Sequence, residues 1–370
     1  MATSDNHSPT FPIPTIILPV TGSPQCDQPS TQRFTGLDGL RAIFCIGIVL
    51  YHINESFHSI FSILLAPVYC YGGYFGNYIF FMISGLLISS HYKKKICQKE
   101  IPFKMYMYKR IFKLYPLYFL SNLAMVLLLL IKGDINSLNI RKLFSTFLMV
   151  SNGWFSNDTP YNLSTWFLCV LLICYAIYYF VSKISARFPR LYLPLCVFLI
   201  FWGALLESKS WNFPFHYRTN GEGYMNFFIG VILSEIITHP DIKRNRILLL
   251  NIASLTLIYF TASLYGFETL PIDTRWVITL LCVNLIFIAI YSETMIKLAT
   301  CSSIQNIGKC SLSIFMWHIP VVHWLFYLET SAGMSNINPL INIIVYFVLL
   351  STVSHFSYQW LEKSRYKHTS

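Results

Sequence analysis

The chain has 370 residues, of which 55% are hydrophobic and 12% are charged. The charged share is about half that of a typical soluble domain, so the composition excludes a soluble globular protein and predicts an all-α, polytopic membrane bundle. The formal net charge of +11 does not indicate a nucleic-acid partner, because the basic residues lie in short gaps between apolar runs.

The first 33 residues differ in composition from the rest of the chain. They hold six of the 17 prolines, several serines and threonines, and almost no charge. This composition is typical of a disordered segment. We therefore expect two regions, a disordered cytoplasmic tail at residues 1–33 and a membrane domain at residues 34–370.

Apolar runs in the second region predict about ten transmembrane helices. They lie near residues 38–54, 74–92, 112–131, 164–182, 190–206, 224–239, 247–265, 276–294, 311–328 and 338–360. Several runs contain Ser, Thr, Asn, Cys or His, which indicates a bundle that encloses a polar cavity. A further apolar stretch at residues 143–150 is too short to cross a bilayer and predicts an interfacial or re-entrant segment.

The segments that connect the predicted helices alternate in their content of basic residues. One set of gaps, counted with the two terminal segments, holds 19 lysines and arginines, and the alternate set holds six. Because cytoplasmic loops are enriched in Lys and Arg, we expect both termini in the cytoplasm. The protein is then a multi-pass protein of the cell (inner) membrane.

Two polar residues, Arg41 and His52, stand inside the first apolar run. Eleven steps make about three helical turns, so both side chains lie on one face, about 16 Å apart along the axis. A charged or ionisable residue in a membrane helix normally faces a bundle interior or a water-filled cavity. The alternative is an arginine that snorkels at the helix end and a histidine in the headgroup region. In either case the loop charges predict that Arg41 lies near the cytoplasmic mouth and His52 near the outer face.

The ten cysteines do not predict a metal site. The sequence has no CxxC motif and no Cys/His cluster with ligand spacing, and five of the cysteines fall in predicted helices. There Cys behaves as a small apolar residue. The glycine-rich motifs of soluble nucleotide sites are also missing, so a nucleotide-bearing donor would be held by the membrane domain and its basic loops.

Five segments resemble signature blocks of the acyltransferase-3 family of integral membrane O-acyltransferases, in the family's order. They are GLDGLRAIFCIGIVLYH (36–52), which holds the family's Arg and His separated by ten residues, GNYIFFMISGLLIS (76–89), KRIFKLYPLYF (109–119), IGKCSLSIFMWHIPVV (307–322) and SYQWLEKSRYK (357–367). The resemblance covers residues 34–367. It implies a membrane enzyme that transfers an acyl group from acyl-CoA to a hydroxyl.

The chain departs from this family pattern at two positions that are often acidic. Tyr78 stands shortly before the Phe-Phe of the second block, and Leu171 ends the segment that begins at Trp166. These departures weaken a mechanism that needs a carboxylate partner for the base. We interpret Ser84-Gly85 in the second block as a close-packing point between helices, not as a nucleophile.

Acyl transfer to a hydroxyl needs a base for the hydroxyl proton and cations for the CoA phosphates. We expect His52 to be the catalytic base, because imidazole is the side chain whose unperturbed pKa lies nearest neutral pH. We expect Arg41 to be the second catalytic residue and also to bind the donor, because its planar guanidinium matches the geometry of a phosphate. Arg110 and Lys113 lie three residues apart on one predicted helix face, and we expect them to form a second binding site for the donor. The alternative is that the two basic residues only fix the orientation of the helix in the membrane.

The late block supplies the candidates for acceptor binding. His318 precedes Pro320 within a predicted helix, where proline disturbs backbone pairing, and it is expected to line the acceptor side together with Trp317. The resemblance adds Tyr115 from the third block. As a lone histidine, His318 is otherwise read as a core residue with satisfied hydrogen bonds.

The sequence therefore predicts a membrane O-acyltransferase, and more specifically an O-acetyltransferase. Its expected partners are acyl-CoA as donor substrate, a cell-surface glycan or lipid-linked sugar as acceptor, and membrane lipids, with no permanently bound cofactor. Two alternatives stay open: a membrane transporter or flippase, and a catalytically inactive member of the fold. A transporter built from repeats predicts matching interrupted helices in two halves, and the sequence shows no such pairing.

Overall fold

The computed structural model describes residues 34–57, 66–209, 211–239, 244–265, 273–334 and 338–363. Within these ranges the regular elements are helices, and the chain forms no strand beyond isolated bridges at Asn152. The all-α prediction is confirmed. Residues 1–33 lie outside the described residues, so the disordered tail stays a prediction.

Ten of the described helices have at least 18 residues. They are α1 (Thr35–Phe57), α2 (Ala66–Cys97), α3 (Phe103–Ile131), α5 (Trp166–Arg187), α6 (Tyr192–Lys209), α7 (Arg218–Thr238), α8 (Arg244–Tyr265), α9 (Thr274–Tyr291), α12 (Ser311–Ser331) and α13 (Pro339–Ser357). Three helices are short: α4 (Ile140–Phe147), α10 (Glu293–Ala299) and α11 (Ser302–Lys309). A π-helical turn over Tyr358–Lys363 continues α13.

Each predicted transmembrane segment coincides with one long helix, and the stretch predicted as too short to cross coincides largely with α4. Eight helices among the described residues are long and apolar enough to cross a membrane, which makes the chain a multi-pass membrane protein. Helices α7 and α8 are also long enough to cross a membrane but fall outside this set, which covers the described residues only. Helix α7 carries Arg218, Glu222 and Glu235, and α8 begins with Arg244 and Arg246.

Helix α2 is the main packing partner of the bundle, since α1, α5, α7 and α9 all lie against it. Its closest approach to α7 depends on Gly85 and Gly230. A Cβ atom on Gly85 would lie 2.0 Å from the carbonyl oxygen of Phe227, and one on Gly230 would lie 2.0 Å from that of Met82. Only hydrogen fits at either position, so the prediction that Ser84-Gly85 is a packing point is confirmed.

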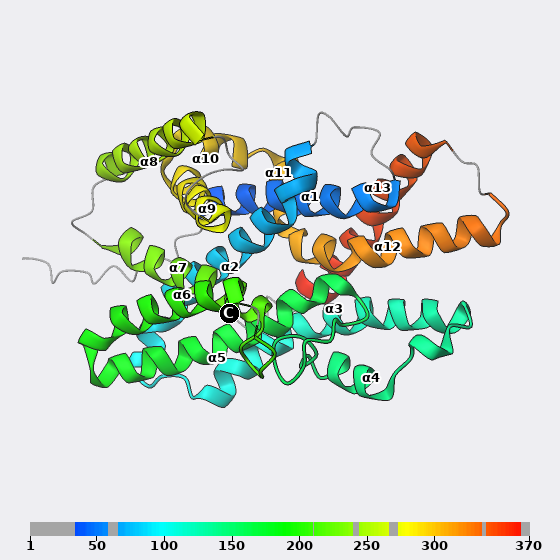
Figure 1. The fold of residues 1–370 in the computed structure, drawn as a ribbon, viewed down its shortest axis with the longest axis horizontal. Helices are drawn as coiled ribbons and strands as arrows, with labels where there is room; N and C mark the ends of the chain where they lie inside the picture. Colours follow the sequence, from blue (N-terminus) through cyan, green and yellow to red (C-terminus); the bar gives the residue numbers. More distant parts are fainter. Residues whose placement is uncertain are drawn as a thin grey trace, which may run out of the picture. The chain divides into compact units, whose positions relative to one another are not determined.

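Helix α1 packs against α2 on one side and against α9 to α12 on others. Figure 1 shows α12 and α13 close to one end of α1. A cluster of apolar residues joins α1, α12 and α13: Val49, Ile53, Val321, Val322, Leu325, Tyr346 and Leu350. This packing brings residues near position 52 next to residues near position 318.

Candidate functional site

The two histidines singled out from separate blocks lie side by side. The ring centroids of His52 on α1 and His318 on α12 are 5.1 Å apart, with the ring planes inclined by 39°. His318 is almost fully buried, whereas His52 keeps part of its surface exposed. The pair therefore has one ring in the core and one that other molecules can reach.

The hydrogen bonds of His318 assign its tautomer. Its Nδ1 atom lies 2.7 Å from the carbonyl oxygen of Phe315. A carbonyl only accepts, so in the neutral ring Nδ1 carries the proton and Nε2 is left as an acceptor. The buried Nε2 atom has no hydrogen-bond partner within the described part of the chain. An acceptor of this kind is suited to taking a proton or to orienting a neighbouring donor.

Local backbone chemistry holds α12 in place around this histidine. Pro320 has no N–H, so it cannot donate to the carbonyl of Met316 four residues earlier. The Nδ2 atom of Asn162 donates to that carbonyl instead, at 2.7 Å. On the other side, the Tyr346 hydroxyl donates to the carbonyl oxygen of His318 at 3.2 Å. The proline thus creates a free acceptor, and a buried asparagine before α5 uses it to join α12 to the core.

Arg41 lies on α1, three turns from His52. It forms an ion pair with Asp38 at 3.6 Å, one turn earlier on the same helix, and its side chain is 28% exposed. At about 1.5 Å per residue, Arg41 and His52 are about 16 Å apart along the helix. The structure therefore does not bring Arg41 into the histidine pair, and it leaves the guanidinium partly accessible.

The predicted donor anchor consists of two residues with different surroundings. The guanidinium of Arg110 lies over the ring of Tyr92, 4.5 Å from the centroid, and donates to the Tyr92 hydroxyl. Its buried Nε atom has no hydrogen-bond partner in the described ranges. Lys113 lies within electrostatic range of Glu362, which accepts a hydrogen bond from Ser313.

The two arginines come from different helices and both act electrostatically on one buried tyrosine. The hydroxyl of Tyr175 on α5 lies within electrostatic range of both Arg110 and Arg41. Both arginines belong to the ends of α1 and α3 that the loop charges assign to the cytoplasmic side. Arg41 and Arg110 therefore both act on one tyrosine of α5, and Arg41 lies about three helical turns from His52.

Trp317 and Tyr115 make hydrogen bonds within the protein. The indole nitrogen of Trp317 donates to the Ser357 hydroxyl at 2.7 Å and joins α12 to the end of α13. The Tyr115 hydroxyl donates to the carbonyl oxygen of Phe147 at 3.0 Å and holds the end of α4 against α3. Both contacts tie helices together, whereas the sequence predicts that these residues bind the acceptor.

Sequence reasoning missed two buried carboxylates. Glu207 and Glu222 are 3% and 7% exposed. The predicted helices end at residue 206 and begin at residue 224, so both glutamates were assigned to a loop. Helix α6 extends to Lys209 and α7 begins at Arg218, which places both inside helices. Acidic residues at the border of long apolar runs are the signal that could have found them.

Tyr78, the apparent departure from the family pattern, contacts one of these carboxylates. Its hydroxyl donates to Oε1 of Glu207, and Oε2 of Glu207 is buried without a partner among the described residues. A carboxylate is thus present beside this position, but it comes from α6 and not from α2. The presence of tyrosine at position 78 is explained by this hydrogen bond, because it fixes the orientation of the Glu207 carboxylate.

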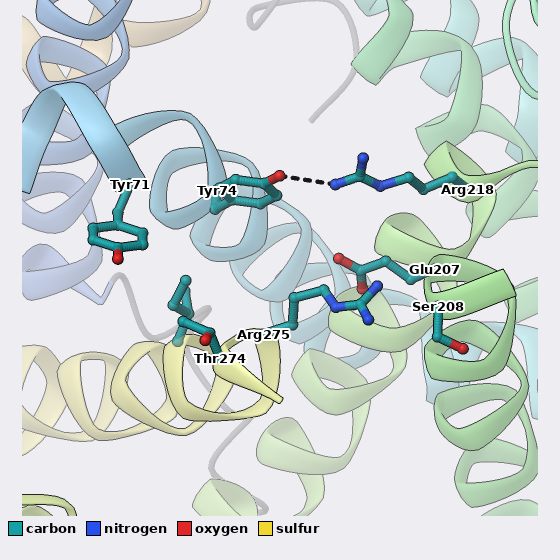
Figure 2. Close-up of a pocket in the computed structure, with 8 residues that line it drawn as sticks. Tyr71, Tyr74, Glu207, Ser208, Arg218, Thr274 and Arg275 are labelled. Atoms are coloured by element: carbon teal, nitrogen blue, oxygen red, sulfur yellow. Dashed lines mark hydrogen bonds between the residues drawn. The ribbon is translucent and has the colours of Figure 1, made fainter. Parts of the chain in front are cut away.

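Glu207 also lines a cavity of about 660 Å³ between α2, α6, α7 and α9. Figure 2 shows tyrosines of α2 facing Glu207 and Arg218, with Arg275 reaching in from α9. The Arg218 guanidinium donates to the Tyr74 hydroxyl at 2.8 Å. Hydrogen bonds from Arg275 hold the pKa of Asp273 below its usual value. The cavity is therefore lined by two arginines, two tyrosines and the nearly buried Glu207.

Comparison with known proteins identifies relatives. A protein of Staphylococcus aureus (strain COL) named "Putative O-acetyltransferase SACOL0978" is 26% identical over 375 residues, covering 88% of this chain and 56% of that protein. "O-acetyltransferase OatA" of Staphylococcus aureus (strain NCTC 8325 / PS 47) is 23% identical over 372 residues, covering 90% of this chain and 57% of that protein. The chain spans about half the length of these curated relatives. No solved structure shows significant similarity.

The family described as "Acyltransferase domain" matches residues 34–356. This range holds α1 with Arg41 and His52, α3 with Arg110, and α12 with His318. It covers nearly all of the helical bundle and both histidines of the pair. The chain belongs to the acyltransferase-3 family.

Proposed function

We propose that this protein is a membrane O-acetyltransferase that moves an acetyl group from cytoplasmic acetyl-CoA to a hydroxyl of a cell-surface glycan or lipid-linked sugar. The observation that carries the proposal is the pair of His52 and His318, 5.1 Å apart inside the acyltransferase domain. The names of the relatives support the acetyl group, since both are named O-acetyltransferases.

In the proposed reaction, His52 takes the proton of the acceptor hydroxyl, because its ring is the accessible member of the pair. The acceptor oxygen then forms a bond to the thioester carbonyl carbon, and the carbon–sulfur bond breaks. CoA leaves as a thiolate and takes up a proton. His318, with Nδ1 bound to Phe315, packs its ring against that of His52 and keeps Nε2 as a second acceptor at the pair.

Donor binding is assigned to the opposite end of the site. Arg41 and Arg110, on two helices, both act electrostatically on Tyr175, and Lys113 stands on the same helix as Arg110. Guanidinium groups bind phosphates through paired N–H donors, so these residues suit the phosphates of acyl-CoA. The thioester would then extend from the cytoplasmic side toward the histidines.

The test is acceptor-dependent release of CoA. Full-length protein in lipid nanodiscs is incubated with acetyl-labelled acetyl-CoA and a panel of glycans, and free CoA thiol and labelled glycan are measured together. We expect both to rise in equal amounts with the correct acceptor. Sugar movement across vesicles without CoA release would instead identify a transporter. Acetyl-CoA binding with no transfer to any acceptor in the panel would favour a catalytically inactive member of the fold.

Topology gives a prediction that is independent of the chemistry. The Lys and Arg residues are divided 19 to 6 between alternate loops, so both termini should be cytoplasmic, in the cell membrane. Reporter fusions at the C-terminus and in the loop at residues 132–139, before α4, should report opposite sides of the membrane. Reporters on a shared side would mean that one helix does not cross, with α7 and α8 the first to re-examine.

A further inference from the structure

The segment of α12 at residues 315–318, which we name the proline turn, carries His318 and ends two residues before Pro320. In a regular helix the carbonyl groups of such a segment accept hydrogen bonds from backbone N–H groups alone. Three of the four carbonyls in the proline turn accept from side chains: that of Phe315 from His318, that of Met316 from Asn162, and that of His318 from Tyr346. The His318 ring is thus bound to a turn that side chains from other parts of the chain hold in place.

The contact between Asn162 and the proline turn follows from the chemistry of proline. The ring of Pro320 clashes with the carbonyl of Met316 and supplies no N–H to it, so this carbonyl is free to accept from outside the helix. Because a carbonyl only accepts, the amide nitrogen of Asn162 faces it, at 2.7 Å. Oδ1 of Asn162 accepts from the Ser164 hydroxyl at 2.9 Å, which fixes the same orientation of the amide.

Asn162 is itself anchored to α3 and to the start of α5. Its backbone N–H donates to Oδ1 of Asn122 on α3 at 2.9 Å, and its carbonyl accepts from the Thr165 hydroxyl at 2.7 Å. Nδ2 of Asn122 donates to Oγ1 of Thr165 at 3.2 Å and closes the network. All three side chains are 0% exposed. A buried network whose members are paired in this way is rigid, so Asn162 is a fixed point for α12.

The fold could satisfy α12 with less buried polarity. Any residue other than proline at position 320 would supply the missing N–H, and the helix would then pair the Met316 carbonyl by itself. Burying an asparagine in an apolar bundle costs free energy unless each of its groups is paired. Pro320 and Asn162 together replace a local hydrogen bond by a long-range one. The position of the proline turn therefore depends on α3 and α5 and not on α12 alone.

The proline turn in turn determines where the His318 ring lies. Nδ1 of His318 is bound to the carbonyl oxygen of Phe315, one residue before the carbonyl that Asn162 holds. The ring contacts that of His52, with centroids 5.1 Å apart, and that of Phe315, with centroids 5.8 Å apart. A shift of the turn would carry the ring with it and change its contact with the proposed base.

We propose that Asn162 is a positioning residue, which acts through the Met316 carbonyl to fix the proline turn and thereby the place of the His318 ring against His52. The inference rests on the proposed function for its effect on catalysis. Its effect on the His318 ring can be measured without any acyl transfer.

The first experiment compares Asn162→Ala with the wild type, as full-length protein in nanodiscs with ¹⁵N-labelled histidine. We expect kcat for acetyl transfer to fall by about 10–100-fold, because a displacement of about 1 Å at a reaction centre can cost about 100-fold. The KM for acetyl-CoA should be unchanged, since Arg41 and Arg110 make their contacts elsewhere. The NMR signals of the His318 ring nitrogens, assigned as those missing from His318→Phe, should change as the bond to Phe315 is loosened. Unchanged kcat and unchanged signals would overturn the proposal.

Asn251→Ala is the matched control. Asn251 on α8 is also buried, and its Nδ2 atom donates to the backbone carbonyl of Asn284 on α9 at 3.0 Å. Its loss removes the same kind of hydrogen bond at another helix pair, so it should lower the melting temperature but leave kcat and the His318 signals unchanged. A loss of kcat as large as that of Asn162→Ala would assign both effects to general loosening of the bundle and contradict positioning.

A second comparison separates positioning from the satisfaction of one carbonyl. In Pro320→Ala the backbone N–H is restored, so removing Asn162 from this variant leaves the Met316 carbonyl with a donor. A purely structural role predicts equal kcat for Pro320→Ala with and without Asn162→Ala. Positioning predicts that the double variant is slower by at least about tenfold, because a carbonyl has two lone pairs and accepts from Asn162 as well. This pair also decides the question should Asn162→Ala alone fail to fold.

The failure of this inference can be told apart from the failure of the proposed function. His318 signals that change in Asn162→Ala, in a protein whose wild type transfers no acyl group, would contradict the transferase and leave the control of the His318 ring standing. Acyl transfer by the wild type, with the same kcat and the same signals in Asn162→Ala, would do the reverse.

Discussion

Replacing His52 with alanine should lower the rate of acetyl transfer by about 10²–10⁴-fold, the usual cost of losing a general base. The reason is geometric: His52 is the accessible ring of the pair, and His318 is buried behind it. Affinity for acetyl-CoA should be unchanged, because the basic residues assigned to the donor lie about three turns away along α1 or on α3. The measurement is the transfer rate at saturating acetyl-CoA, with donor affinity determined in parallel.

The control for this variant is His91→Ala. His91 is exposed on α2, and its Nδ1 atom lies 2.8 Å from the carbonyl oxygen of Leu87, so its loss should leave the transfer rate unchanged. A folded and fully active His52→Ala protein would contradict the proposed role of His52 as the base. His318 would then be the candidate base, because its Nε2 atom is unprotonated in the tautomer assigned above.

Replacing Arg110 with alanine should weaken acetyl-CoA binding by about 10–100-fold, the effect of losing a hydrogen bond to a charged group worth about 1.5–3 kcal/mol. The Arg110 guanidinium is held over Tyr92, and its Nε atom has no partner in the described part of the chain. Arg110→Lys should recover little affinity, because an ammonium has neither the fork nor the planar stacking of a guanidinium. Titrations of acetyl-CoA at low and high salt measure the effect, which should shrink as salt rises.

Arg141→Ala provides the matched control for the donor site. Arg141 is an exposed arginine on α4, on the side that the loop charges assign to the exterior, so its loss should not change donor affinity. Equal affinities for the wild type and Arg110→Ala would limit Arg110 to fixing the topology. A loss that does not respond to salt would contradict an ionic contact with the phosphates.

The helices could be predicted from the sequence because a bilayer leaves the backbone few options. An apolar run in lipid must satisfy its own N–H and C=O groups, and a helix does so locally. The same argument failed at helix ends, where polar residues continue a helix beyond the apolar run. Glu207 and Glu222 lie in such extensions, so the carboxylates of α6 and α7 were missed.

The sequence by itself determined the bundle of membrane helices and the family, and it selected His52 and His318 as candidate site residues. Only the tertiary structure decided that these histidines lie 5.1 Å apart, because 265 residues separate them and the packing of α1 on α12 brings them together. It also decided which donor serves the carbonyl that Pro320 leaves free, since Asn162 comes from a loop before another helix. Local patterns encode what each residue can do, and long-range packing selects which residues meet.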